Sequence, residues 1–355
     1  MKIFNCNLES FTIDSIDKRH KLKDLWIVDS NISSLTSDAF VNLKSLEVLG
    51  IDDNNIENID KNIFNNLKAL KRLINLASLE SLELTRDSSI EEINEDTFSS
   101  LSYNVHTPGL KKLKSLKALN NKLTKLPFDL FEDLIEVSNL RFHVNRIAEV
   151  EESIFDNLPN LTQLDLSVNK IKKLPNDLFK NSLKLKFFDE WENELESICG
   201  VFSKNLQYSE YFNVHSSIIK SFQPNFFQEM LGLCSLEFRQ NGVEKLSKGA
   251  FKNLPSLAYL NLQANNINPI SNAVFEEVSL LSGLVLNSNN MKTLETNCFD
   301  AVSNLTNLDL YNNKIENLCN FGQTKSSLGQ SGFLAQSDFS KSAEQKTLKE
   351  PNTLL

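Results

Sequence analysis

The segment LTQLDLSVNKI, residues 161–171, sets the pattern that decides the fold. Its apolar residues fall at positions 1, 4, 6 and 11 of the segment, and asparagine stands at position 9. The same frame fits LEVLGIDDNNI at 46–56 and LAYLNLQANNI at 257–267. The inward and outward alternation over positions 3–7 is typical of a short β-strand. Because one such strand cannot bury its apolar side alone, the pattern predicts a stack of repeated coils.

The frame recurs along most of the chain, and most starts lie 24 residues apart. A second mark is a phenylalanine eighteen residues after position 1, as at Phe155, Phe251 and Phe275. Two steps are longer, 33 and 34 residues, and place extra residues within about 68–78 and 102–112, where a functional loop and mis-spliced sequence are both open. The predicted repeat domain is 1–318, with a partial coil at 1–21 and twelve coils that start at 22, 46, 79, 113, 137, 161, 185, 208, 233, 257, 281 and 305.

Two parts of the chain depart from the regular pattern. In the coil from 185, Glu190 stands at position 6, where an aliphatic residue belongs; the coil from 208 has Asn213 there and Phe226 in the phenylalanine column. A charge inside the wall is costly unless it is paired, so we expect a bulge around 185–215. The pattern stops after residue 318, and 319–355, rich in Ser, Gln and Lys, is predicted to be a mostly disordered tail.

The combined pattern, LxxLxLxxNxI followed by FxxL on a 24-residue period, resembles the extracellular class of leucine-rich repeats. Toll-type receptor ectodomains, chaoptin, connectin and Slit share that class, and the resemblance covers about residues 1–318. It implies an α/β solenoid, a curved horseshoe with a parallel β-sheet on the concave face and irregular or short helical segments on the convex side. Because terminal caps are not visible, the sequence is interpreted as a fragment that lacks both caps; a complete protein with unusual ends is the alternative.

The asparagine at position 9 has a physical role in such a stack. The chain turns out of the strand there, and an amide side chain offers donors and an acceptor to the backbone of a neighbouring coil. We therefore predict a structural column made of Asn54, Asn121, Asn145, Asn169, Asn193, Asn241, Asn265, Asn289 and Asn313.

No motif in the sequence points to catalysis. GxGxxG, GxxxxGK[ST], HExxH and GxSxG are all missing, so we expect neither an enzyme nor a bound cofactor. The five cysteines form no CxxC pair, and His143 and His215 stand three coils apart, so no metal site is expected. A net charge of −9 disfavours a nucleic-acid partner, and no apolar run is long enough for a transmembrane segment.

Positions 2, 3, 5, 7 and 8 are predicted to face the concave side, where large side chains gather in mid-chain. Exposed aromatic residues and arginine are common anchors of protein interfaces. The alternative is that Phe187 and Trp191 turn inward to repair the irregular coil. The expected partner is a protein, with or without glycans, and an exposed sheet edge leaves a homodimer open. The predicted partner-binding patch is Arg141, His143, Phe187, Trp191, Phe212, His215, Arg239 and Tyr259.

The resemblance implies a non-enzymatic recognition module for adhesion, matrix or innate-immune recognition, secreted or at the cell surface. The start of the sequence lacks the features of a secretory signal peptide, which favours the alternative, a cytoplasmic scaffold or regulatory subunit. Asn31, Asn160 and Asn304 begin N-x-S/T triplets and are candidate N-glycosylation sites.

Overall fold

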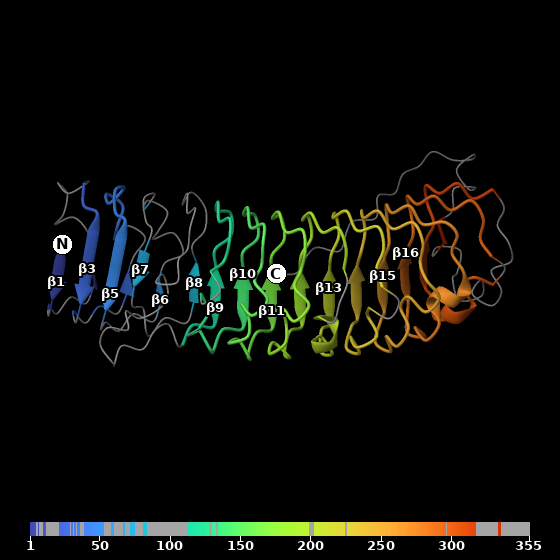
Figure 1. Ribbon diagram of the computed structural model, residues 1–355, viewed down its shortest axis with the longest axis horizontal. Coiled ribbons are helices and arrows are strands. Elements are labelled where there is room, and N and C mark those ends of the chain that lie inside the picture. The colour runs from blue at the N-terminus through green and yellow to red at the C-terminus, as the bar shows by residue number, and fades with distance from the viewer. Residues whose placement is uncertain are drawn as a thin grey trace.

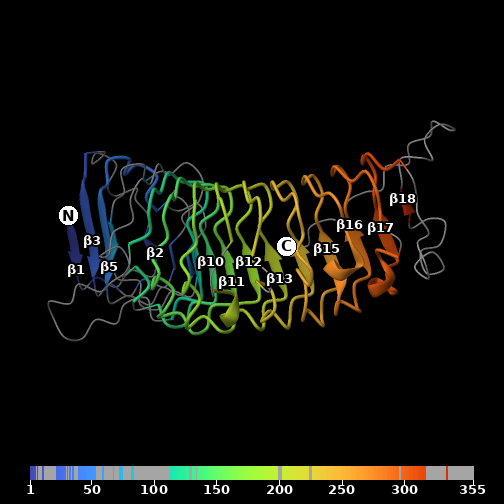
Figure 2. The same cartoon turned by 45° about the vertical axis from the view of Figure 1, so that its right-hand side comes forward.

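The computed structural model shows a chain wound into stacked coils, whose short strands pair in parallel with those of neighbouring coils. The strands stand side by side along the long axis, from the blue N-terminal coils to the orange C-terminal ones (Figures 1 and 2). The structure describes residues 1–4, 6, 10–11, 21–28, 30, 32, 34–35, 39–52, 58–59, 67, 72–74, 81–83, 112–127, 130–132, 134–198, 202–223, 226–295, 297–316 and 333–334.

The largest sheet has eleven parallel strands in the order β18-β17-β16-β15-β14-β13-β12-β11-β10-β9-β8. Successive pairs from β9 to β17 keep a spacing of 24 residues, for example Leu140 with Leu164 and Leu260 with Leu284. Its strands are β8 (Ser81–Glu83), β9 (Ser115–Lys117), β10 (Asn139–Arg141), β11 (Gln163–Asp165), β12 (Phe187–Asp189), β13 (Tyr211–Asn213), β14 (Ser235–Glu237), β15 (Tyr259–Asn261), β16 (Gly283–Val285), β17 (Asn307–Asp309) and β18 (Phe333–Leu334).

Two smaller parallel sheets lie in the N-terminal coils. One has the order β1-β3-β5-β7 and the other β2-β4-β6. Their strands are β1 (Lys2–Phe4), β2 (Ser10–Phe11), β3 (Asp24–Val28), β4 (Ser34–Leu35), β5 (Val48–Asp52), β6 (Asn58–Ile59) and β7 (Arg72–Ile74). The described helices are short and of the 3-10 type: η3 (Phe202–Asn205), η4 (Asn272–Phe275) and η5 (Asp300–Val302). None of the described helices is long and apolar enough to cross a membrane.

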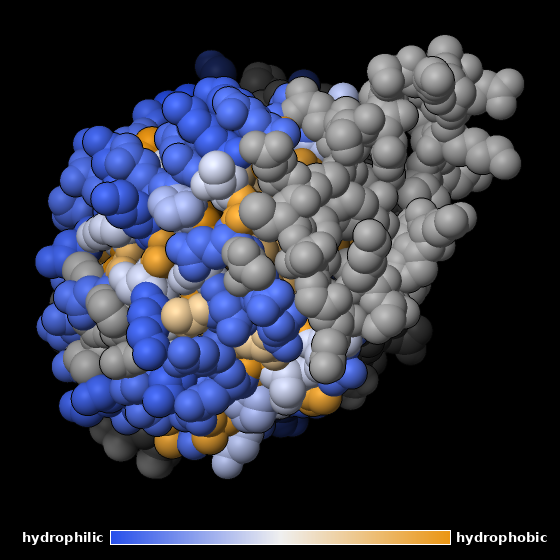
Figure 3. Space-filling view, turned by 90° about the vertical axis from the view of Figure 1, so that its right-hand side faces the viewer, coloured by the Kyte–Doolittle hydropathy of each residue, from blue (hydrophilic) through white to orange (hydrophobic). Residues whose placement is uncertain are grey.

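The core is a column of apolar side chains inside the coils. Leu116, Leu140, Leu164, Leu236 and Leu260 are all at most 1% exposed, and each stands at position 4 of its coil. Burial of one such side chain stabilises the fold by about 1.5–3 kcal/mol. The described residues on the face seen from the C-terminal coils are mainly hydrophilic, with apolar residues in separate small patches (Figure 3).

Phenylalanine rings form a second buried column inside the coils. The ring centroids of Phe155 and Phe179 are 6.3 Å apart, and those of Phe251 and Phe275 are 6.5 Å apart; both pairs are stacked. Phe227 continues the column, with its ring stacked 5.9 Å from that of Phe251. Each pair adds about 0.5–1.5 kcal/mol beyond its buried area.

The expected coil start at residue 208 is wrong by one residue. Phe212 pairs with Phe188 on one side and with Leu236 on the other, so the coil starts at Ser209 and both of its steps are 24 residues. Ser209 is fully buried, whereas Tyr208 is 59% exposed. A slip of one residue moves every strand side chain to the other face, so Asn213 faces outward and Phe227, not Phe226, belongs to the phenylalanine column.

The structure has strands in two segments where the sequence predicted none, the first insertion and the C-terminal tail. The strand β7 lies within the predicted insertion at 68–78 and pairs with β5 on the regular period, Val48 with Arg72. The strand β18 lies within the predicted tail and pairs with β17. The second predicted insertion, except for Lys112, and the rest of the tail lie outside the described residues, so both stay predictions.

Asparagine side chains at position 9 tie neighbouring coils together. The Nδ2 of Asn169 donates to the Phe142 carbonyl in the preceding coil at 3.1 Å, and its Oδ1 accepts from the Ile147 amide at 3.0 Å. Asn145, Asn193, Asn241, Asn265, Asn289 and Asn313 repeat this pair of bonds. Asn121 bonds the Leu119 carbonyl of its own turn, and Asn54 lies outside the described residues.

Position 8, just before the asparagine, has a left-handed backbone in every coil from the one that starts at 113 to the one that starts at 305. The φ angle is 51° at Glu192, 55° at Ser216 and 53° at Gln240. This conformation turns the chain out of the strand and directs position 8 toward the rim of the concave face. Val144 and Val168 adopt it as well, at 57° and 53°, although β-branched residues are strained there.

Glu190 is fully buried at position 6 of the coil from 185, and neither of its carboxyl oxygens has a hydrogen-bond partner. Burial raises its pKa well above the ordinary value, so it is held in the protonated form. The strands of this region show no bulge among the described residues: β12 keeps register with β11 and β13, and the Glu190 amide donates to the Asn213 carbonyl at 2.9 Å.

We predict that Glu190→Leu raises the free energy of unfolding by about 1–3 kcal/mol, because it removes two unsatisfied buried oxygens. Because the pKa of Glu190 is raised in the folded state, its protonated carboxyl contributes stability below the ordinary pKa of 4.5. This contribution is lost as pH rises through the folded-state pKa. The gain over wild type should therefore grow with pH above about 4.5 in urea unfolding. Glu196→Leu, at an exposed position of the same coil, is the matched control. An equal gain in both variants, or a gain independent of pH, contradicts this account.

Candidate partner-binding site

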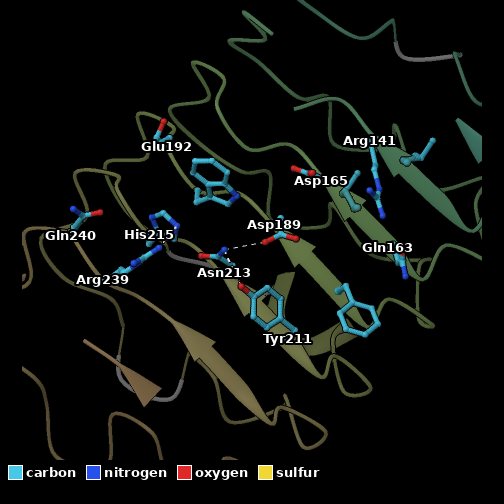
Figure 4. A pocket seen from close by; sticks show the side chains of 14 residues that line it. Arg141, Gln163, Asp165, Asp189, Glu192, Tyr211, Asn213, His215, Arg239 and Gln240 are labelled. Atoms are coloured by element: carbon cyan, nitrogen blue, oxygen red, sulfur yellow. Dashed lines mark hydrogen bonds between the residues drawn. The ribbon is translucent and has the colours of Figure 1, made fainter. Parts of the chain in front are cut away.

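A hollow of about 800 Å³ opens on the concave face over five neighbouring strands, β10 to β14. Asp189 lies in its middle, with Arg141 and Gln163 on one side and His215 and Arg239 on the other (Figure 4). The full lining is Leu140, Arg141, Gln163, Leu164, Asp165, Phe187, Asp189, Trp191, Glu192, Tyr211, Asn213, His215, Arg239 and Gln240.

The repeat places this lining in three columns, because residues 24 apart stand side by side. Phe187 and Tyr211, at position 3, form one wall. Asp165, Asp189 and Asn213, at position 5, form the floor. The opposite wall is formed by Trp191, His215 and Arg239 at position 7. Successive residues of one column lie about 4.8 Å apart, so each side chain contacts its counterpart in the next coil.

The position-7 wall is fixed by ring stacking and by a chain of hydrogen bonds. The rings of Trp191 and His215 are 5.2 Å apart and nearly parallel, at 17°. Ser216 donates its one hydroxyl proton to Gln240, so it accepts from Nδ1 of His215, 2.7 Å away. This leaves Nε2 of His215 to accept from Arg239, at 3.4 Å.

His215 is therefore neutral at ordinary pH. Burial lowers its pKa to about 4, and the nearby charge of Arg239 acts in the same direction. A neutral imidazole can accept from Arg239 without repelling a second cation, so the wall holds one tautomer and one charge state.

The two floor carboxylates differ in how well they are paired. Asp165 lies 2.8 Å from Nδ1 of His143 and accepts from the Ser167 hydroxyl at 2.6 Å. Burial alone would raise its pKa, but the contacts with His143 and Ser167 outweigh burial and hold the pKa below the ordinary value. Asp189 accepts from Asn213 at 3.0 Å, and no basic side chain of the described residues forms an ion pair with it.

Burial, and then the like charge of Asp165, raise the pKa of Asp189 to about 6. Arg141 and His143 oppose the shift but do not cancel it. Ionised Asp189 is thus a carboxylate whose charge is not matched by the protein around it. The protonated Asp189 carboxyl contributes stability that is fully present below the ordinary pKa of 3.8 and is lost as pH rises through about 6.

Asn213 links the floor to the aromatic wall. It is 5% exposed, and its Nδ2 donates both to Asp189 and to the Tyr211 hydroxyl, at 3.0 and 3.1 Å. Its Oδ1 is buried without a hydrogen-bond partner. Since both amide protons are already used, the group of Asn213 that lacks a hydrogen-bond partner is an acceptor.

Five residues of the predicted patch line the hollow: Arg141, Phe187, Trp191, His215 and Arg239. Phe187 is 38% exposed, so the alternative in which Phe187 and Trp191 turn into the core is wrong. The placement of Phe212 on this face is also wrong: its side chain is fully buried, because the true frame puts it at position 4.

The remaining two predicted residues face the concave side but do not line the hollow. His143 is held against Asp165. The ring of Tyr259 lies over Gly283 of the next coil, where an added Cβ would stand 2.9 Å from its Cδ2 atom. Glycine at this position therefore leaves room for Tyr259 to lean away from the hollow.

The sequence prediction did not include several lining residues, chiefly Asp165, Asp189, Tyr211 and Asn213. The frame that began at Tyr208 assigned Tyr211 and Asn213 to the core. The predicted steps on either side of residue 208, 23 and 25 residues, together equal two regular steps of 24 residues. This irregularity was the signal that could have corrected the frame.

The fold and this face define a class of protein, a parallel β-solenoid with a preformed hollow on its sheet. Residues 20–74, 135–189, 210–267 and 255–315 match the family model described as Leucine rich repeat. These segments cover more than half of the chain, and the chain belongs to the leucine-rich-repeat family. No curated protein matches the sequence.

Solved structures with the same fold include the Toll–Spatzle complex of Drosophila and a plant peptide hormone receptor, RGFR1, in complex with RGF2. The first is 21% identical with a TM-score of 0.55, and the alignment covers 89% of this chain and 41% of the other. The second is 22% identical with a TM-score of 0.56 and covers 86% of this chain and 50% of the other. The chain thus spans half or less of the length of these two structures, and the likeness shows the fold.

We predict that the Asp189 carboxyl titrates with a midpoint of about 6 in carbon-detected NMR of aspartate-labelled protein. Its signal is assigned by its loss in Asp189→Asn. Asp165→Asn removes the neighbouring negative charge and should lower the midpoint. A midpoint in wild type near the ordinary value of 3.8 contradicts the burial and crowding described here.

Proposed function

We propose that this protein is a non-catalytic recognition module that binds a protein or peptide partner in the hollow over β10 to β14. The observation that carries the proposal is the state of the lining, which is ordered before any partner arrives. Trp191, His215 and Arg239 are held by stacking and hydrogen bonds, and Asn213 joins Asp189 to Tyr211. Side chains that are already fixed lose little conformational freedom on binding, which favours affinity.

The residue types of the lining support the same proposal. Tryptophan, tyrosine and arginine are the residues that most often dominate the binding energy of protein interfaces. The leucine-rich-repeat fold serves as a binding scaffold in the two receptors with known ligands, Toll with Spatzle and the plant receptor with RGF2.

We further propose that the protein acts outside the cell or at its surface, in adhesion, matrix or innate-immune recognition. The 24-residue repeat and the receptor-like neighbours support this location. Asn304 is exposed, and its Nδ2 donates to the Ser279 carbonyl at 2.7 Å; Asn160 makes the same kind of bond to Ile135 at 3.2 Å. A glycan replaces one of two amide protons, so either bond could persist beside it. Asn31 lies outside the described residues.

The binding proposal predicts that peptides selected from a random displayed library engage the hollow. Trp191→Ala, Phe187→Ala and Arg239→Ala should each weaken the selected peptides by about tenfold or more, as truncation of an interface anchor does. The control is Tyr311→Ala, at position 7 of the coil from 305, 47% exposed and outside the hollow. Calorimetric titration measures the affinities. Peptides that bind all three hollow variants as tightly as wild type would refute the proposal.

The location proposal predicts N-linked glycan on the protein isolated from its own cells. Treatment with peptide N-glycosidase F should lower the intact mass and convert Asn304, Asn160 or both to aspartate. An unchanged mass, together with antibody staining only after the cells are permeabilised, contradicts an extracellular location.

A further inference from the structure

We infer that the hollow receives a cationic side chain, a lysine or arginine, carried by an extended segment of the partner. This inference rests on the proposed function and names the chemistry that the site would recognise. It is carried by acceptors on the floor that the protein leaves unmatched, and by the aromatic walls on either side of them.

The floor of the hollow presents acceptors without matching donors. Oδ1 of Asn213 is buried with no hydrogen-bond partner, and the residue as a whole is only 5% exposed. Asp189, one coil away, has a single donor, Asn213 itself, among the interactions of the described residues. A guanidinium carries five donors and an ammonium three, so either group can satisfy several of these oxygens at once.

The pairing of Asp165 shows that the floor is not simply an acidic column. Asp165 accepts from the hydroxyl and the amide of Ser167 and lies 2.8 Å from Nδ1 of His143, whereas Asp189 faces the open middle of the hollow between the two walls. The raised pKa of Asp189 agrees with this contrast, because a buried carboxylate without a counter-charge is costly to ionise. An incoming cation would supply the counter-charge at this one place.

The walls suit the rest of a long basic side chain. Phe187 and Tyr211 stand on one side of the floor, and the stacked rings of Trp191 and His215 on the other. Positions 3 and 7 lie about 13 Å apart along a strand, which leaves room between the walls for an aliphatic stem. Cations bind favourably over aromatic faces, most of all over tryptophan, and neutral His215 adds no repulsion.

The charges at the ends of the hollow are consistent with a cation in its middle. Arg141 and Arg239 lie at opposite ends, on the coils of β10 and β14 (Figure 4). The lining holds three carboxylates, Asp165, Asp189 and Glu192, against these two arginines. Among the described residues no group of three His, Cys, Asp or Glu side chains is arranged to hold a metal ion. An organic cation therefore fits the site better than an anion or a metal.

The test uses the full chain labelled with 5-fluorotryptophan, which gives one fluorine signal from Trp26 and one from Trp191. The probes are the N-acetyl amides of arginine, lysine, glutamine and glutamate. Arginine and lysine amides should shift the Trp191 signal to saturation and leave the Trp26 signal unchanged. Glutamine and glutamate amides should bind at least about tenfold more weakly, the loss expected when a counter-charged pair is removed. Trp191→Phe assigns the signals.

Two variants locate the interaction. Asp189→Asn should weaken the arginine amide about tenfold, and Glu192→Gln, at an exposed position on the rim, should weaken it less. The matched control is Asp309→Asn, at position 5 of the coil from 305 and outside the hollow, which should change nothing. The unliganded position of the Trp191 signal reports whether each variant is folded. A cation-induced shift that survives Asp189→Asn in a folded protein overturns the inference, as does tighter binding of the glutamate amide.

Failure of this inference differs from failure of the proposed function. Library-selected peptides whose basic residues can be changed to glutamine without loss, but which still lose affinity for Trp191→Ala, overturn the cationic anchor and leave the binding hollow standing. Peptides that bind Trp191→Ala, Phe187→Ala and Arg239→Ala as tightly as wild type overturn the proposed function itself. In that case the amino-acid amides still decide whether the hollow prefers a cation.

Discussion

The structure depends on one constraint, that a residue of one coil pairs with the residue 24 positions later in the next. Two interactions impose it together. The buried leucines of position 4 fix which face of each strand points inward, and the asparagines of position 9 fix the height of each turn by bonding the backbone of the preceding coil. Because the constraint applies to every position, outward residues also line up. The hollow is made in this way, from three columns that no single coil could supply.

The same constraint explains which parts of the site could be predicted from the sequence. The phase of the leucines alone predicts the stacked coils and the parallel sheet. It also places Arg141, Trp191 and Arg239 on the concave face. Tyr211 and Asn213 did not follow, because the frame of their coil was anchored on exposed Tyr208 rather than on buried Ser209. A small residue at position 1 carries no hydrophobic signal, and the large residue beside it does. The error was one residue, and it exchanged the core and surface faces of a whole strand.

The protonation states and the hydrogen-bond partners of the site are harder to predict from the sequence. An aspartate on the solvent-facing, concave side of the sheet is usually solvated, and nothing in the local sequence distinguishes Asp189 from Asp165. Their difference arises between coils: His143 and Ser167 pair with Asp165, while Asn213 alone bonds Asp189. Similarly, the neutrality of His215 depends on Ser216, Gln240 and Arg239. Such relations depend on the geometry of stacking, so only the structure shows them.

The register between β12 and β13 determines the coil start at Ser209, the buried face of β13 and the residues of β13 that line the hollow. Cross-linking tests this register most directly. In a Cys234→Ser background, the account predicts that a Phe187→Cys/Tyr211→Cys pair forms a disulfide under mild oxidation, because paired residues of neighbouring strands lie about 4.8 Å apart. The Phe187→Cys/Glu210→Cys pair should stay reduced, since its side chains point to different places. Peptide mass mapping after proteolysis reads out both. Closure of the second pair and not the first would place the coil start at Tyr208 and contradict the site described here.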